Sequence, residues 1–159
     1  MKVTVAAIGK LKSGPEKLMA EDYAERIVAI GKKAGVTALK ISDWAESQRS
    51  DVASRMAEEE AQLWSGITTH SYVIALDERG ISHTSEAFAA HLRKVIERGH
   101  DIVFLLGGPD GHSAGTRQNA NELLALGAMT WPHRLARIML LEQIYRSVTI
   151  MLNHPYHRA

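Results

Sequence analysis

Short apolar runs alternate with amphipathic stretches along the whole chain. The apolar runs predict strands at Lys2–Ile8 and at residues 36–41, 72–76 and 102–106, with a shorter strand at 126–129. The runs at 72–76 and 102–106 contain no polar residue. Such uninterrupted runs are typical of parallel strands that are buried on both faces.

The stretches between these runs have helical spacing, which predicts helices at residues 13–33, 43–64, 84–99 and 113–124 and at His133–Met151. Ser13 is a candidate N-cap with Glu16 completing a capping box, and Gly35 suits the end of that helix. Strand and helix thus alternate five times. This order predicts an α/β fold with a mainly parallel sheet and helices on both of its faces.

Ligands of such sheets bind beyond the carboxyl ends of the strands. Three loops are therefore expected to form a site: the loops after Leu76 and after Leu106, and the segment at residues 127–132.

Length and composition favour one globular domain spanning residues 1–159, because 159 residues can bury a sizeable core. The chain has no cysteine, which excludes disulfides, zinc-thiolate sites and a cysteine nucleophile. It also has no apolar run near the length of a membrane span, and its first residues look like a strand and not like a signal peptide. A soluble cytoplasmic protein is expected, with no membrane partner and no metal site.

The net charge of +1 is unevenly distributed. Residues 131–159 carry +3 from four arginines and one glutamate, and the remainder carries −2. Arginine is the side chain best suited to bind a phosphate through two parallel hydrogen bonds. This uneven distribution of charge therefore suggests a local anionic partner such as nucleic acid. A chance fluctuation of surface charge explains the same numbers.

Two loops carry candidate binding chemistry. Residues 107–111 (Gly-Gly-Pro-Asp-Gly) allow a tight turn or a close approach to a ligand, although the run matches neither a dinucleotide fingerprint nor a P-loop. Residues 126–133 combine small residues with Met129, Thr130 and Trp131. That mixture suits a flat heterocycle held by main-chain hydrogen bonds, but the segment taken alone favours a strand, a helix cap and a proline helix start.

The last helix and the tail supply candidate catalytic groups. His133 falls in the first turn, where the helix dipole favours a neutral imidazole that is either a base or a local hydrogen-bond partner. Glu142 and Arg146 are four residues apart and are expected to pair. The tail at residues 153–159 (Asn-His-Pro-Tyr-His-Arg-Ala) is either frayed or functional; if functional, its aromatic, imidazole and guanidinium groups suit RNA chemistry.

Four motifs together resemble one family: residues 105–111 (Leu-Leu-Gly-Gly-Pro-Asp-Gly), 129–137 (Met-Thr-Trp-Pro-His-Arg-Leu-Ala-Arg), 141–146 (Leu-Glu-Gln-Ile-Tyr-Arg) and 154–158 (His-Pro-Tyr-His-Arg). The chain resembles the RlmH family, the SPOUT-class pseudouridine N3-methyltransferases of bacterial 23S rRNA. The resemblance spans the chain and is densest after Leu105. Gly127 and Trp131 depart from the serine and leucine expected there.

The resemblance implies a SPOUT fold with a carboxyl-terminal trefoil knot, a homodimer, and S-adenosylmethionine as cofactor. Knots are rare, so the order of elements alone would exclude one. The implied cofactor contacts are Leu76, Gly107, Gly108, Gly127, Ala128, Met129, Thr130, Trp131 and Pro132.

The resemblance also implies methyl transfer to N3 of a pseudouridine in the intersubunit hairpin of 23S rRNA, within the assembled ribosome. We expect His157 to accept the N3 proton, Arg158 to favour the anionic base, and Tyr156 to pack against it, with His133 as the alternative base. Phosphates are assigned to Arg134, Arg137, Arg146 and His154. The alternatives are a SPOUT enzyme for another nucleotide, a non-catalytic ribosome-binding factor and a dinucleotide-binding domain.

Overall fold

A computed structural model describes residues 1–158, with the side chain of Arg158 outside that description. The five strands are β1 (Lys2–Ile8), β2 (Ala38–Trp44), β3 (Ser71–Ile81), β4 (Asp101–Leu106) and β5 (Glu122–Leu124). The α-helices are α1 (Pro15–Gly31), α2 (Val52–Trp64), α3 (Ser85–Glu97), α4 (Ala114–Asn119) and α5 (His133–Met151). Two short 3-10 helices are η1 (Lys32–Ala34) and η2 (Pro155–Arg158).

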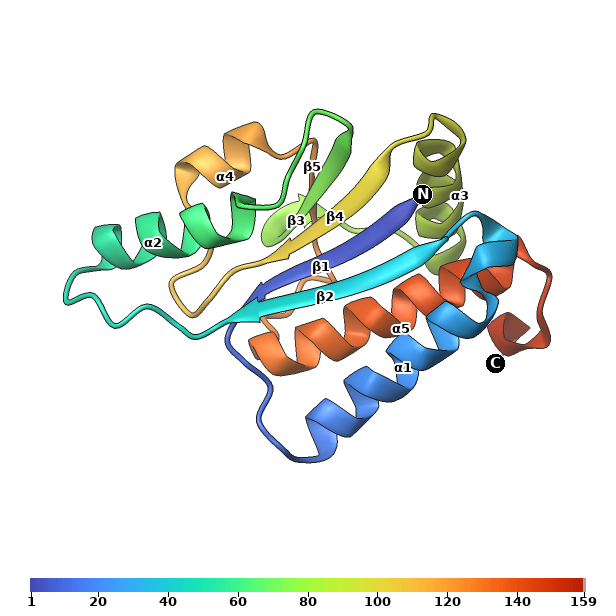
Figure 1. The fold of residues 1–159 in the computed structure, drawn as a ribbon, viewed down its shortest axis with the longest axis horizontal. Helices are drawn as coiled ribbons and strands as arrows, with labels where there is room; N and C mark the ends of the chain where they lie inside the picture. The colour runs from blue at the N-terminus through green and yellow to red at the C-terminus, as the bar shows by residue number, and fades with distance from the viewer. Residues whose placement is uncertain (159) are drawn as a thin grey trace.

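The strands form one parallel sheet in the order β2-β1-β4-β3-β5. Figure 1 shows α1 and α5 on one side of this sheet and α2 and α4 on the other. The predicted α/β architecture, with a parallel sheet between two helical layers, is confirmed.

Each face of the sheet has its own core. Val5 and Phe104 point toward α1, α3 and α5 and are fully buried, because alternate residues of a strand face opposite sides. Ile8 and Leu105 point the other way and pack with Leu63 of α2. The central strands β1, β4 and β3 are therefore covered on both faces, as the uninterrupted apolar runs of β3 and β4 predict.

Two helix predictions need correction at their starts. The N-cap of α1 is Gly14, and no side chain caps it, so Ser13 and Glu16 do not form the expected capping box. The second helix begins at Val52 and not at residue 43, because β2 continues to Trp44 and the side chain of Asp51 caps the helix by accepting from the N–H of Ser54 at 2.8 Å. The turn at Gly35 (φ 88°) is as predicted, and Thr84 caps α3 by accepting from the N–H of Ala87.

The end of the sheet differs most from the prediction. The helix expected at residues 113–124 stops at Asn119, since Ala120 is extended and the Asn121 side chain accepts from the N–H of Val73 at 2.7 Å. The fifth strand is therefore Glu122–Leu124, and the strand expected at residues 126–129 is absent from the described chain.

The loop expected after Leu76 is instead a continuation of β3 as far as Ile81, with a register shift between these two residues. Gly80 lies directly against the backbone of β5, where a Cβ atom would come within 2.5 Å of the carbonyl of Leu123. Only glycine permits this close approach of two backbones.

None of the described helices is both long enough and apolar enough to cross a bilayer.

Candidate functional site

A cavity of about 550 Å³ opens at the carboxyl ends of β3, β4 and β5. Three segments border it: residues 76–79, residues 106–112, and residues 124–127 with 129–133. The strand-end rule selects these three regions, although the first of them lies within β3, which continues to Ile81. The volume of the cavity lies within the usual range for small-molecule sites. Of the residues assigned to the cofactor from the sequence, the structure places these at its wall: Leu76, Gly107, Gly108, Gly127, Met129, Thr130, Trp131 and Pro132. Ala128 does not line it.

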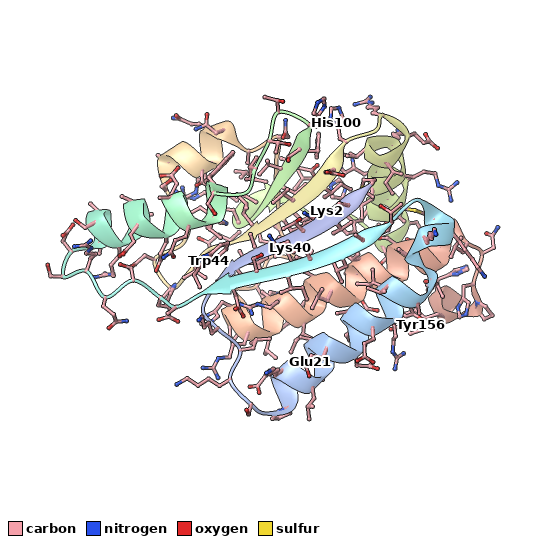
Figure 2. The ribbon with its side chains drawn as sticks, viewed as in Figure 1. Lys2, Glu21, Lys40, Trp44, His100 and Tyr156 are labelled. Carbon is pink, nitrogen blue, oxygen red and sulfur yellow. The ribbon has the colours of Figure 1, made fainter. Side chains whose placement is uncertain are left out.

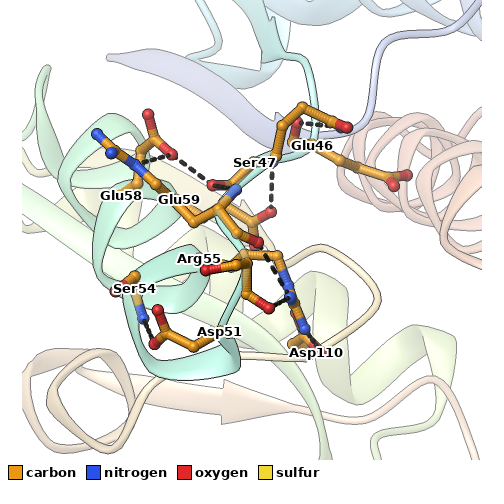
Figure 3. A network of polar contacts seen from close by, with 11 residues as sticks. Glu46, Ser47, Asp51, Ser54, Arg55, Glu58, Glu59 and Asp110 are labelled. Atoms are coloured by element: carbon orange, nitrogen blue, oxygen red, sulfur yellow. Dashed lines mark hydrogen bonds and ion pairs between the residues drawn. The ribbon is translucent and has the colours of Figure 1, made fainter.

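The glycine loop after β4 is held in place from α2. Arg55 donates from Nε to Oδ2 of Asp110 at 2.8 Å and from Nη2 to Oδ1 at 3.4 Å. The same guanidinium donates to the carbonyl groups of Arg49 and Ser50. These hydrogen bonds hold the pKa of the Asp110 carboxyl below its ordinary value. Figure 3 shows this contact joining the two elements.

A buried carboxylate of α2 packs against the same loop. Glu59 of α2 is 4% exposed, and its Oε1 accepts from the N–H of Ser47 at 3.0 Å. A Cβ atom at Gly108 would come within 2.9 Å of Oε2 of Glu59. Glycine at this position therefore lets the loop lie against α2 while its other side borders the cavity.

The segment after β5 forms the opposite wall. Trp131 donates its indole N–H to the carbonyl of Leu126 at 3.2 Å, which closes the segment on itself. Gly127 has φ 109°, an angle that L side chains rarely adopt, so this bend needs glycine. Met129 is 73% exposed, and the wall therefore presents apolar surface as well as backbone groups. This arrangement can hold a flat heterocycle.

His133 is the predicted catalytic candidate that lines the cavity of its own chain. It is the first residue of α5, and its Nε2 lies 3.8 Å from Oε1 of Glu46. The imidazole is half-buried, with one side facing the cavity. A proton acceptor at this position is within reach of a bound ligand.

Two charged residues of the cavity wall have no motif in the sequence to mark them. Asp77 belongs to the extended part of β3 and Arg117 to α4, and the two form an ion pair at 2.7 Å. Asp77 was expected in a loop and Arg117 on an ordinary helix. Only the fold brings the two residues together.

Arg137 requires a correction. The sequence assigns it to RNA phosphates, but its side chain is 1% exposed. Nη1 donates to Oδ2 of Asp43 at 3.1 Å, and Nη2 donates to the carbonyl of Gly9. Burial lowers the pKa of the guanidinium. Arg137 therefore joins α5 to the ends of β1 and β2, and no phosphate can contact it in this structure.

The pair of Glu142 and Arg146 forms as predicted, at 2.8 Å. Tyr156 adds to it by donating its hydroxyl to Oε1 of Glu142 at 3.1 Å. The Arg146 guanidinium lies 5.0 Å from the centre of the Tyr156 ring, and Tyr145 packs against that ring edge-on. The ring is thus packed partly within its own chain, and its expected contact with the target base stays a prediction.

The tail is ordered over the described residues. It forms η2, which packs against α5, and the backbone N–H of His154 is bound to the carbonyl of Thr149. His154 is exposed, while His157 is half-buried, and its Nδ1 is buried with no hydrogen-bond partner in the described part of the chain. The expected role of Arg158 depends on a side chain outside the described part.

The tail and the cavity lie at different ends of α5. None of residues 153–158 lines the cavity. The tail's contact at Glu142 is nine positions after His133, which is about 14 Å along a helix axis. Figure 2 shows Tyr156 at the end of the molecule away from Trp44, the last residue of β2. Of the remaining RNA candidates, exposed Arg134 lies at the cavity end, whereas Arg146 and His154 lie toward the tail.

Comparison with known proteins identifies the class. The family described as "Predicted SPOUT methyltransferase" matches residues 1–157. A protein named "Ribosomal RNA large subunit methyltransferase H" from Bradyrhizobium diazoefficiens is 46% identical over the full length of both chains. The protein of the same name from Rhodopseudomonas palustris (strain BisB5) is 49% identical, again over the full length of both.

Solved structures are more distant. A putative RNA methyltransferase from Bacillus anthracis has a TM-score of 0.47 and 14% identity, covering 92% of this chain and 94% of that one. A putative methylase family protein from Neisseria gonorrhoeae has a TM-score of 0.48 and 14% identity, covering 91% and 80%. The assignment therefore depends on the family match and the full-length relatives. The chain belongs to the SPOUT methyltransferase family.

Proposed function

We propose that this protein transfers a methyl group from S-adenosylmethionine to N3 of a pseudouridine in 23S rRNA within the assembled ribosome. The observation that carries the proposal is the cavity at the strand ends, bordered by the motif segments of a chain that matches SPOUT methyltransferases throughout. The name shared by its full-length relatives supports the large-subunit rRNA as substrate.

The cavity walls fit the cofactor. The glycine loop at Gly107 and Gly108 and the segment from Gly127 to Pro132 offer backbone groups, while Leu76, Met129 and Trp131 offer apolar contact. When bound, the cofactor supplies an electrophilic methyl group. The protein's task is to align that group with N3 of the base at close range, which removes much of the barrier to a displacement.

N3 of pseudouridine carries a proton that must leave for the nitrogen to attack. His157 is the proposed acceptor, and Arg158 stabilises the negative charge that develops on the base. The Nδ1 of His157 is buried without a hydrogen-bond partner among the described residues, so accepting the proton requires the ring to turn outward toward the base. His133 is the alternative acceptor, since it already lines the cavity.

The separation of tail and cavity favours a homodimer in which each site combines the cavity of one protomer with the tail of its partner. In one chain, Arg134 lies near the cavity, and Arg146 and His154 lie near the tail. An antiparallel dimer brings these groups together at the opening of one cavity, where they contact RNA phosphates. The knot implied by the family is part of this proposal.

A paired methylation assay tests the proposal. The protein and labelled S-adenosylmethionine are incubated with assembled ribosomes from cells that lack this activity, and with matched ribosomes that also lack the pseudouridines of the intersubunit hairpin. Isolated large subunits serve as a third substrate. We expect label only on assembled, pseudouridylated ribosomes, mapped to N3 of one nucleotide.

Each other result has a defined meaning. Equal label with and without pseudouridine keeps the methyltransferase and moves its target to another nucleotide. Equal label on isolated subunits contradicts the requirement for the assembled particle. Ribosome binding without label identifies a non-catalytic factor and contradicts the proposed activity.

A further inference from the structure

Asp77 and Arg117 form a rigid pair in the cavity wall. Arg117 donates from Nε to Oδ2 of Asp77 at 2.7 Å, and the backbone N–H of Arg79 donates to Oδ1 at 3.0 Å. The Asp77 side chain is 5% exposed. Both carboxylate oxygens are therefore occupied, and Asp77 serves to hold the arginine.

The charge state of the pair is well defined. Burial by itself would raise the pKa of Asp77, but the hydrogen bonds from Arg117 and from the backbone of Arg79 outweigh it and lower that pKa. Asp77 is thus ionised at neutral pH. An ionised, buried carboxylate fixes the Nε edge of the guanidinium in one orientation.

The opposite edge of the guanidinium is free. Arginine has five N–H donors in a planar fork, and only the Nε donor is used in this contact. Neither terminal nitrogen of Arg117 is hydrogen-bonded within residues 1–158, and the side chain is 27% exposed where it lines the cavity. Two parallel N–H groups at such an edge match the two oxygens of a carboxylate.

The other cations of the wall are less suited to this task. Arg79 is exposed at the rim, with no hydrogen bond to its side chain among the described residues. Burial lowers the pKa of His112, whose Nε2 lies 3.3 Å from the carbonyl of Leu105, so this imidazole stays neutral. Arg117 is therefore the anchored positive charge of the wall.

We propose that Arg117, oriented by Asp77, binds the carboxylate of the amino-acid portion of S-adenosylmethionine. The inference rests on the proposed cofactor and extends it by assigning one end of the molecule. The heterocycle then lies against the apolar segment after β5, across the cavity. Arg117 acts as a specificity-determining residue that distinguishes the complete cofactor from fragments without the carboxylate.

Calorimetric titration tests this assignment without turnover. The ligands are S-adenosylhomocysteine and its decarboxylated form, which differ only in the carboxylate. The wild type is expected to prefer the first by about 10- to 100-fold, the usual range for a charge-assisted bidentate contact. Arg117→Ala should lose that preference while binding the decarboxylated ligand as the wild type does, which also reports that the variant is folded.

Two further variants sharpen the result. Arg117→Lys keeps the charge but cannot hold Asp77 and a carboxylate with one planar group, so we expect only part of the preference to return. Arg79→Ala removes a neighbouring cation of the same type, and the preference should remain.

Three results overturn the assignment. In the first, Arg117→Ala keeps the preference for the ligand with the carboxylate. In the second, Arg79→Ala loses that preference and Arg117→Ala does not. In the third, Arg117→Ala weakens only ribosome binding, which assigns the residue to an RNA phosphate. If the wild type binds neither ligand, the proposed cofactor itself is contradicted. The last result is distinct from the first three, in which the wild type binds both ligands.

Discussion

Tyr156 in the tail donates its hydroxyl to Oε1 of Glu142, the carboxylate that also pairs with Arg146. One carboxylate thus joins the carboxyl-terminal tail to the middle of α5. This contact orders the segment that carries His157 at a fixed place relative to the helix.

Tyr156→Phe should therefore loosen the tail without changing the cavity. The loss of one hydrogen bond to a charged group is expected to reduce the free energy of unfolding by about 1 kcal/mol. Urea unfolding measures that loss, and faster hydrogen exchange confined to residues 153–158 locates it. Unchanged exchange in the tail would show that ring packing against Tyr145 alone holds it.

The same variant gives a pH test. Burial, with the neighbouring Tyr23 and the hydrogen bond to Glu142, raises the pKa of Tyr156 above its ordinary value of 10.0. The folded protein then retains a proton that the unfolded chain releases, so stability is lost as the pH rises above about 10. Alkaline unfolding of the wild type should be steeper than that of Tyr156→Phe. Parallel curves would contradict the assigned environment.

Arg137→Ala tests the corrected role of a buried arginine. Removing the guanidinium leaves the carbonyl of Gly9 and the carboxylate of Asp43 without their donor. We expect the free energy of unfolding to fall by about 3 kcal/mol.

The matched variant is Arg134→Ala, which changes an exposed arginine in the first turn of the same helix. We expect it to keep the stability of the wild type and to reduce the salt dependence of ribosome binding by about one phosphate contact. A reduced salt slope in a folded Arg137 variant would return Arg137 to the RNA contacts.

Arg55→Ala should release the glycine loop from α2. The loop at Gly107–Asp110 would lose the guanidinium that holds Asp110, and we expect affinity for S-adenosylhomocysteine to fall by about three- to tenfold through reduced preorganisation. Calorimetry measures this change. The double variant Arg55→Asp with Asp110→Arg exchanges the two charges and should recover part of the lost affinity. No recovery would show that residues 55 and 110 do not act through their ion pair.

His112 predicts acid sensitivity. Burial of the imidazole lowers its pKa below the ordinary value of 6.5. Below that pH the unfolded chain therefore binds a proton that the folded protein does not bind. Stability is present above about pH 6.5 and is lost as the pH falls toward the folded pKa, with a slope of up to about 1.4 kcal/mol per pH unit. His112→Leu should flatten this part of the stability profile. An unchanged slope would assign it to other groups.

The buried strands and the last helix were predictable because their sequence signals are strong. Residues 72–76 and 102–106 are uninterrupted apolar runs, and Pro132 marks the start of α5. The edge strand β2 was predicted at residues 36–41 and lies at Ala38–Trp44, because an exposed edge has no such run to mark its ends. The short strand β5 was missed because it depends on Asn121 binding the backbone of β3, which is a tertiary contact.

The same distinction applies to the site. The loops that border the cavity follow from strand order, since the ends of parallel strands meet at one edge. Asp77 and Arg117 could not be paired from the sequence, because 40 positions separate them and neither belongs to a motif. Arg137 was predicted to be an exposed cation that binds RNA, because the spacing of residues along the sequence does not show that the ends of β1 and β2 pack against its side chain.

Complementation between two inactive variants tests the central claim, that each site combines the cavity of one protomer with the tail of its partner. One variant has the cavity filled by Leu76→Trp and fails to bind S-adenosylhomocysteine; the other ends at Leu152 and lacks the tail. Each should be inactive alone on assembled ribosomes.

Mixed by unfolding and refolding together, the two variants should form mixed dimers in half of the population. Each mixed dimer then holds one intact cavity facing one intact tail. We predict methylation at about one quarter of the wild-type rate for the same total protein, as random pairing of symmetric dimers requires. No activity in a sample whose mixed dimers are demonstrated by mass spectrometry would contradict a shared site.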